Sequence, residues 1–192
     1  MKIVDTDLIK VKELYNQFIK LMVKDFNDNY DVNIENALAF IAQFYKELIS
    51  NIKREKHPEV SNLPSLGIYC LCGFNVCRTT NTLSYDFLNE IGFDLHLQFV
   101  HIDENNDWHI GKNMYANHVV VCIDKKASTI YFDLVNDLCF ETVNDKINVI
   151  SIDSKDIKID YDNYKEIINQ ISNTLDKYLL YENLGIERVY TY

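Results

Sequence analysis

One short stretch, Gly73-Phe74-Asn75-Val76-Cys77-Arg78, decides how the rest of this chain is arranged. Over residues 77–91 the apolar residues recur at helical spacing, and Gly92 stands where a glycine commonly ends a helix. The pattern therefore predicts a helix that begins at Cys77. The free N–H groups and the positive dipole end of a helix N-terminus favour the thiolate form of a cysteine. Cys77 is thus a candidate nucleophile, and the alternative is an ordinary buried cysteine.

Two downstream segments, Asn117-His118-Val119-Val120-Val121 and Tyr131-Phe132-Asp133-Leu134, are predicted to form the strands of a hairpin. A turn centred on residues 125–126 would place His118 directly opposite Asp133, with Cβ atoms about 5 Å apart, unless a β-bulge breaks the register. A carboxylate there accepts the imidazole N–H, fixes the tautomer and stabilises the protonated ring. The pair is a candidate base and orienting acid, and the alternative is an ordinary polar contact at a sheet end.

The other elements follow from the spacing of apolar residues. Helices are predicted over residues 7–26, 34–54 and 162–184, and strands over 93–102, 118–123, 128–134 and 147–152. A short extended piece is predicted for 66–72, a polar loop for 103–117, and a turn with a weak strand for 136–145. The polar segment from His57 to Pro64 is the predicted linker between an N-terminal helical extension, residues 1–60, and a core domain, residues 61–192.

Three further side chains are candidates for supporting roles. Arg78 directly follows the candidate nucleophile. It is a candidate to brace the site through a carboxylate, Asp86 or Glu90, and the alternative is an ordinary charge at the surface or core edge. Trp108 and Tyr115 lie in the loop that precedes His118 in the sequence. They are predicted to line a substrate cleft, although burial as core aromatics fits the pattern equally well.

A metal site is the rival interpretation of the cysteines. Cys70 and Cys72 would share one face of the predicted extended piece, where Cys77 and His118 could complete a zinc site. A Cys-x-Cys pair without a second close pair matches structural zinc spacings poorly, so a thiol nucleophile without metal is preferred. The remaining cysteines are predicted to be small core residues: Cys122 and Cys139.

Composition limits the classes of partner. The chain has 192 residues, a hydrophobic fraction of 47% and a net charge of -10, with lysines and arginines scattered along it. The absence of a basic stripe argues against nucleic acid and against an anionic membrane surface as partners. The longest apolar run, residues 119–123, is too short to span a bilayer. Five cysteines in no recognisable disulfide spacing favour a reducing cytoplasm.

The order of these motifs resembles a known family. Gly-x-x-Val-Cys-Arg, a helix, Asn-His-Val-Val-Val and Tyr-Phe-Asp-Leu together look like the transglutaminase-like superfamily of papain-related cysteine enzymes. The resemblance covers roughly residues 66–152, and it implies Cys77 as nucleophile, His118 as base and Asp133 as orienting acid. The chain departs from the family at two places. Val119 and Val120 follow the histidine, where the family commonly has an aromatic residue, and Leu134 follows the aspartate, where the family commonly has a proline.

The resemblance also implies a fold and a reaction. We expect an α+β protein in which a catalytic helix packs on an antiparallel sheet, as in a transglutaminase-like or papain-like core. The expected function is that of a peptidase, amidase or acyltransferase that acts on a peptide or glutamine-type amide through a thioester and needs no cofactor. A catalytically inactive binding module with the same fold is the alternative.

Overall fold

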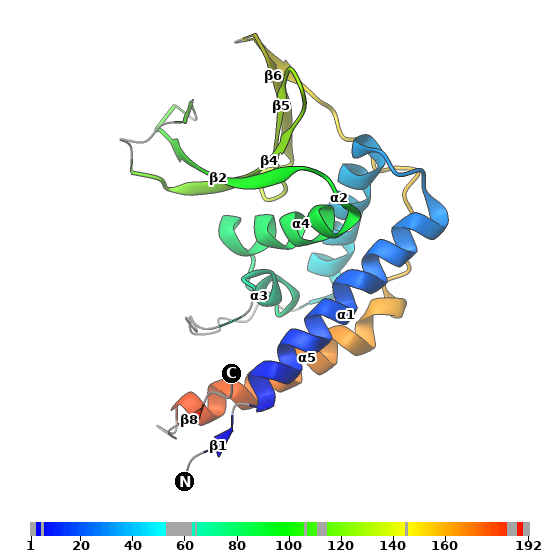
Figure 1. Ribbon diagram of the computed structural model, residues 1–192, viewed down its shortest axis with the longest axis vertical. Helices are drawn as coiled ribbons and strands as arrows, with labels where there is room; N and C mark the ends of the chain where they lie inside the picture. The colour runs from blue at the N-terminus through cyan, green and yellow to red at the C-terminus, as the bar shows by residue number, and fades with distance from the viewer. Residues whose placement is uncertain are drawn as a thin grey trace.

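The computed structural model is an α+β fold in which the helices lie on one side of a curled antiparallel sheet (Figure 1). The structure describes residues 3–4, 6–52, 63, 65–105, 107–110, 115–144, 146–183 and 188–189. The coarse prediction of an α+β fold with helices packed on an antiparallel sheet is confirmed. Most of the predicted linker from His57 to Pro64, and the boundary at residue 60 within it, lie outside the described residues.

The described helices are α1 (Thr6–Asn29), α2 (Ile34–Asn51), α3 (Gly67–Leu71), α4 (Cys77–Ile91) and α5 (Asp162–Asn183). The predicted start and end of α4 are both confirmed, and Gly92 ends the helix with φ 106°. The short piece predicted as extended is wrong, because residues 67–71 form α3. A short apolar run fits a buried helix and a buried strand equally well. Here Gly73, with φ 89°, reverses the chain directly after the helical turn.

The main sheet has the strand order β3-β2-β4-β5-β6-β7, and every neighbouring pair is antiparallel. Its strands are β2 (Leu95–Ile102), β3 (Trp108–His109), β4 (His118–Asp124), β5 (Thr129–Asp133), β6 (Leu138–Val143) and β7 (Lys146–Val149). The loop predicted before His118 thus contains a two-residue strand. A separate parallel pair joins β1 (Ile3–Val4) to β8 (Arg188–Val189).

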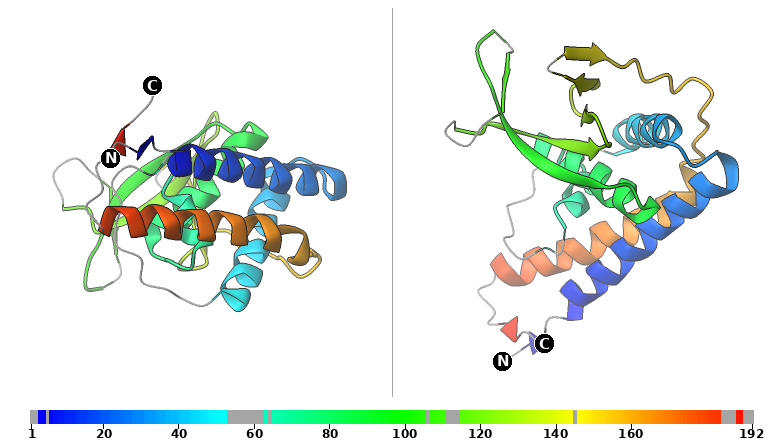
Figure 2. Two further views of the ribbon diagram at one scale, coloured as in Figure 1. Left: turned by 90° about the horizontal axis from the view of Figure 1, so that it is seen from below. Right: turned by 45° about the horizontal axis from the view of Figure 1, so that its top comes forward.

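The sheet curls into a half-barrel whose convex side receives the helices (Figures 1 and 2). Helix α4 packs against β2 and β4, and α1 packs along both α4 and α5. One apolar core joins residues from α1, α2, α3, α4 and α5 to the helix-facing side of β4, β5 and β6. Within it Phe40 stacks on Phe87, which ties α2 to α4. The core therefore fixes α4 relative to the sheet, and this fixes where Cys77 stands.

A second, smaller apolar cluster lies on the opposite, concave face of the sheet. Its buried members are Val100, Val120 and Cys122, and Ile102, Trp108 and Tyr131 pack against them. Alternation along β4 puts Val121 and Ile123 in the main core and Val120 and Cys122 in this second cluster. In the described part of the chain, no helix is long and apolar enough to cross a membrane.

Candidate active site

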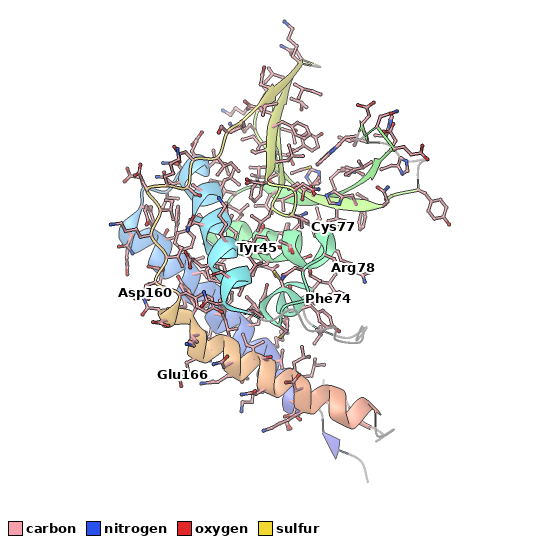
Figure 3. All side chains as sticks on the ribbon, turned by 180° about the vertical axis from the view of Figure 1, so that it is seen from behind. Tyr45, Phe74, Cys77, Arg78, Asp160 and Glu166 are labelled. Atoms are coloured by element: carbon pink, nitrogen blue, oxygen red, sulfur yellow. The ribbon has the colours of Figure 1, made fainter. Side chains whose placement is uncertain are left out.

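Cys77 is the first residue of α4, and the loop before it is tied to the first turn of the helix. The backbone N–H of Val76 donates to Thr79 Oγ1 at 3.1 Å, and Thr79 Oγ1 donates to the carbonyl of Phe74 at 2.5 Å. Thr79 is buried, so these bonds are shielded from competing water. Figure 3 shows Cys77 and Arg78 at the end of α4 that lies next to the sheet. Cys77 stands at the start of the helix, as predicted, and it is half-buried.

Cys77 and His118 line the same cleft, although they come from different elements. The cleft has a volume of about 380 Å³ and lies between the start of α4, β2 and the start of β4. Its lining residues are Val76, Cys77, Arg78, Phe99, Ala116, Asn117, His118 and Val119. Cys77 and His118 thus border one open space.

His118 and Asp133 are in direct contact. His118 Nε2 lies 2.6 Å from Asp133 Oδ2, the imidazole side chain is 10% exposed and the carboxylate 1%. Two other pairs have similar distances, His96 with Asp124 at 2.9 Å and His109 with Asp103 at 2.8 Å. Burial separates them, because the side chains of both of these pairs are at least 29% exposed. Only a buried pair of this kind holds its geometry without strong competition from water.

His118 and Asp133 meet as predicted, but the predicted register between β4 and β5 is wrong. The hairpin pairs Asp124 with Thr129 and Val121 with Phe132, so its turn is centred one residue later than predicted. This register continues with Val120, not His118, opposite Asp133. His118 lies two positions away on the same face, a diagonal neighbour within reach of a long side chain. A shift of two residues keeps each side chain on its face, which is why the pair still meets.

The carboxylate of Asp133 accepts hydrogen bonds on both oxygens. Oδ2 accepts from His118 and from Asn136 Nδ2 at 2.7 Å, and Oδ1 accepts from Asn81 Nδ2 at 3.1 Å and from the N–H of Val135 at 3.2 Å. Burial alone raises the pKa of Asp133, but the hydrogen bonds from His118, Asn81 and Asn136 outweigh it and lower the pKa below its ordinary value. Asp133 is therefore ionised at neutral pH and holds Nε2–H toward itself. This leaves Nδ1 of His118 as the ring nitrogen for accepting a proton.

Asn81 is a site residue that the sequence analysis missed. It lies on α4, four residues after Cys77, and its side chain is fully buried. Besides its bond to Asp133, its Nδ2 donates to the carbonyl of Val119 at 2.7 Å, and its Oδ1 accepts from the N–H of Leu134 at 3.0 Å. One amide thus joins the helix of the nucleophile to both strands of the His–Asp pair. The available signal was a polar residue at a core-facing position of the helix, one turn beyond the cysteine.

Trp108 and Tyr115 lie in different surroundings. The Trp108 ring packs edge-on against His118, with ring centroids 5.9 Å apart, and against Phe140 at 5.3 Å. It therefore supports the base from the concave face. Tyr115 has a 96% exposed side chain, and its backbone carbonyl accepts from His101 Nδ1 at 2.8 Å.

One of the two predicted partners of Arg78, Asp86, has another role in the structure. Arg78 itself lines the cleft beside Cys77. Asp86, by contrast, accepts hydrogen bonds from Tyr15 Oη at 2.7 Å and Ser65 Oγ at 2.6 Å. This carboxylate therefore joins α4 to α1 and to the start of α3.

The other four cysteines are buried. Cys70 lies on α3, and its thiol contacts Asn75 Oδ1 at 3.3 Å and Thr80 Oγ1 at 3.8 Å. Burial raises the pKa of Cys70 to about 12, which keeps it a neutral thiol at physiological pH. Because α3 is helical, the shared strand face on which the zinc alternative depended does not form. The described residues contain no group of three or more His, Cys, Asp or Glu side chains placed to hold a metal ion.

The fold and the site were compared with known proteins. Neither protein-family models, nor curated proteins, nor solved structures gave a significant match to this chain. The resemblance to transglutaminase-like enzymes therefore stays a prediction that depends on the motifs themselves.

Proposed function

We propose that this protein is a transglutaminase-like cysteine enzyme, a hydrolase or acyltransferase that acts on a peptide or glutamine-type amide. The observation that carries the proposal is the buried 2.6 Å contact between His118 and Asp133 at the cleft that Cys77 also lines. A thiol at a helix N-terminus, an imidazole and a buried carboxylate are the three groups that nucleophilic thiol catalysis requires.

In the proposed mechanism, Nδ1 of His118 takes the thiol proton of Cys77, and Asp133 stabilises the resulting imidazolium. The thiolate attacks the amide carbonyl carbon, a C–S bond forms, and negative charge moves to the carbonyl oxygen. The N–H of Cys77, which has no acceptor within α4 because it is the first helical residue, is a donor for this oxyanion. The C–N bond then breaks, and the imidazolium gives its proton to the leaving amine.

The thioester left on Cys77 is resolved by a second nucleophile. Water or an amine attacks the thioester carbonyl, and His118 takes a proton from the attacking molecule. The C–S bond then breaks and regenerates the thiolate. Water yields an acid, and an amine yields a new amide. Phe99, Val119 and Val76 give the cleft an apolar lining that suits the uncharged part of an acyl donor.

Intact-mass spectrometry on the purified protein tests the proposal. The protein is incubated with a panel of peptide amides, glutamine-containing peptides and activated esters, and then quenched in acid to preserve thioesters. We expect one acyl adduct on the wild type and none on Cys77→Ala. The matched control is Cys139→Ala, which removes a buried thiol away from the cleft and leaves the adduct in place.

Two outcomes would contradict the proposal. An adduct that persists in Cys77→Ala assigns the reactivity to another residue. A wild type that binds peptides but forms no adduct with any activated ester is a binding module and not an enzyme.

A further inference from the structure

The hairpin of β2 and β3 places two histidines directly opposite each other. His101 on β2 pairs with His109 on β3, and their ring centroids are 6.1 Å apart with the ring planes tilted by 37°. The next pair of this hairpin, Ile102 and Trp108, belongs to the concave face, so alternation puts the two histidines on the other face. In Figure 1 the end of β2 that carries His101 extends beyond the start of α4. The side chain of His109 is 40% exposed, so water and small ions reach the two rings.

Each of the two rings has one nitrogen held by a hydrogen-bond acceptor. Nδ1 of His101 lies 2.8 Å from the carbonyl oxygen of Tyr115, and Nε2 of His109 lies 2.8 Å from Oδ2 of Asp103. A carbonyl and an ionised carboxylate only accept hydrogen bonds, so both of these ring nitrogens carry the proton. The other nitrogen of a neutral imidazole keeps its lone pair. His101 therefore presents Nε2 as an electron-pair donor, and His109 presents Nδ1.

This arrangement is the one that surrounds metal-binding histidines. A histidine that binds a metal ion almost always donates its other N–H to a carboxylate, a backbone carbonyl or water. The carboxylate of Asp103 is itself held, because Oδ1 accepts from the N–H groups of Asn105 at 2.8 Å and Asp107 at 3.0 Å. Two nitrogens that share one ion at about 2.1 Å each are about 3–4 Å apart, which suits rings whose centroids are 6.1 Å apart.

The facing imidazoles distinguish this pair from the other histidine contacts of the sheet. His96 also contacts a carboxylate, with Nδ1 2.9 Å from Asp124 Oδ2, but its partner on β4 is Cys122. His118 contacts Asp133 and Trp108. A contact between a histidine and an aspartate is therefore common in this sheet, and the second imidazole is what makes a chelating pair.

We propose that His101 and His109 form a binding site for a divalent transition-metal ion, a function separate from the proposed thiol chemistry. Imidazole nitrogen suits Ni²⁺, Cu²⁺ and Zn²⁺, whereas Mg²⁺ and Ca²⁺ take oxygen ligands. Since the described residues hold no group of three or more ligating side chains, two nitrogens are the protein's share of the coordination and water completes it. The ion joins β2 to β3 and so holds the two-residue strand β3 in place.

Isothermal titration calorimetry of the full chain, without a polyhistidine tag, tests the site at neutral pH. Ni²⁺ is the probe, because imidazole binds it well and the five thiols of the chain are open to oxidation by Cu²⁺. We expect saturable binding of one Ni²⁺ per chain. His101→Gln and His109→Gln should each weaken this binding about tenfold or more, because each removes one of the two protein ligands. Ni²⁺ should also raise the melting temperature of the wild type and leave that of both variants unchanged.

His96→Gln is the matched control, because it removes an exposed imidazole that contacts a carboxylate but faces no second histidine. It should bind Ni²⁺ within about twofold of the wild type. Far-UV circular dichroism checks that each variant is folded, and either ligand variant alone is a sufficient test.

Three results would overturn the proposal. The first is a wild type that shows no saturable Ni²⁺ binding, and the second is equal affinity in the wild type and a folded His101→Gln or His109→Gln. The third is loss of binding in Cys77→Ala, which would assign the ion to the thiol of the candidate active site. Acyl transfer to Cys77 is measured without metal, so failure of the metal site and failure of the proposed enzyme are read separately.

Discussion

Replacing Asn81 tests how the nucleophile helix and the His–Asp pair are joined. Its amide is fully buried and makes three hydrogen bonds, to Val119, Asp133 and Leu134. Asn81→Ala leaves the buried N–H of Leu134 without its side-chain acceptor and removes one donor from Asp133. An unsatisfied buried polar group costs about 1–3 kcal/mol, so the loss of these two bonds should lower the unfolding free energy by about 2–6 kcal/mol in total.

Asn81→Asp adds an electrostatic component of known sign. The new carboxylate would stand where the amide nitrogen now lies, 3.1 Å from Asp133 Oδ1, so two buried carboxylates would face each other. One of them must take up a proton, and its pKa in the folded protein must rise above the unfolded value. The variant is therefore less destabilised at pH 5 than at pH 8, because the protonated form relieves the repulsion only at the lower pH.

Asn136→Asp is the control for this effect. Asn136 donates to the same carboxylate at 2.7 Å, but it is exposed, so water screens the new charge. Urea unfolding, followed by far-UV circular dichroism at both pH values, measures the three variants. Equal pH dependence of Asn81→Asp and Asn136→Asp, or a loss of less than about 1 kcal/mol in Asn81→Ala, would refute the role given to Asn81.

The remaining predictions concern the contact between α1 and α4 and, for comparison, the glycine that ends α4. Burial raises the pKa of Asp86 despite hydrogen bonds from Ser65 and Tyr15, so the native state holds this proton more tightly than the unfolded chain. The contribution of Asp86 to the unfolding free energy should then fall as the pH rises from about 4 through the raised pKa, so the unfolding free energy of the wild type minus that of Asp86→Asn, measured in urea, should decrease over this range. Gly67→Ala should lower the melting temperature and break the Tyr15–Asp86 bond, because its Cβ would stand 2.1 Å from Tyr15 Oη. Gly92→Ala meets no atom within 4 Å, so it should cost only the backbone strain at φ 106°, about 1–2 kcal/mol by calorimetry. If Gly67→Ala lowers the stability no more than Gly92→Ala does, the close packing of Tyr15 against Gly67 is contradicted.

The parts of the fold set by local patterns were predicted from the sequence. The helix over 77–91 has an apolar stripe and a terminal glycine, and both depend on residues close in sequence. The start of α2 is likewise set locally, because Oδ1 of its cap residue Asn33 accepts from the N–H of Asn36 at 2.8 Å. The region 66–72 carries no such mark, because a run of a few apolar residues has no measurable period. Its helical state is set by packing beneath α4 and by the reversal at Gly73.

The sequence predicts the His118–Asp133 contact but not the strand register or the role of Asn81. Sequence alternation gives the face of each strand residue reliably, so His118 and Asp133 were placed on one face even with the wrong turn. The turn itself was misplaced because residues 124–128 lack the Gly or Asn that fixes a two-residue hairpin turn. Asn81 could not be assigned to Asp133, because a contact across 52 residues depends on how α4 sits on the sheet. The row of rings beside His118 is also a product of tertiary structure.

The proposed chemistry requires that His118 activates Cys77. Four of the five cysteines are buried, so Cys77 is the accessible thiol, and its alkylation by iodoacetamide is followed by intact mass. The second-order rate constant at pH 6 should fall about tenfold or more in His118→Gln, since only the thiolate reacts and the imidazolium stabilises it. His96→Gln, which alters an exposed pair with Asp124, should react within about twofold of the wild type. Equal rates in wild type and a folded His118→Gln would contradict the proposed catalytic pair.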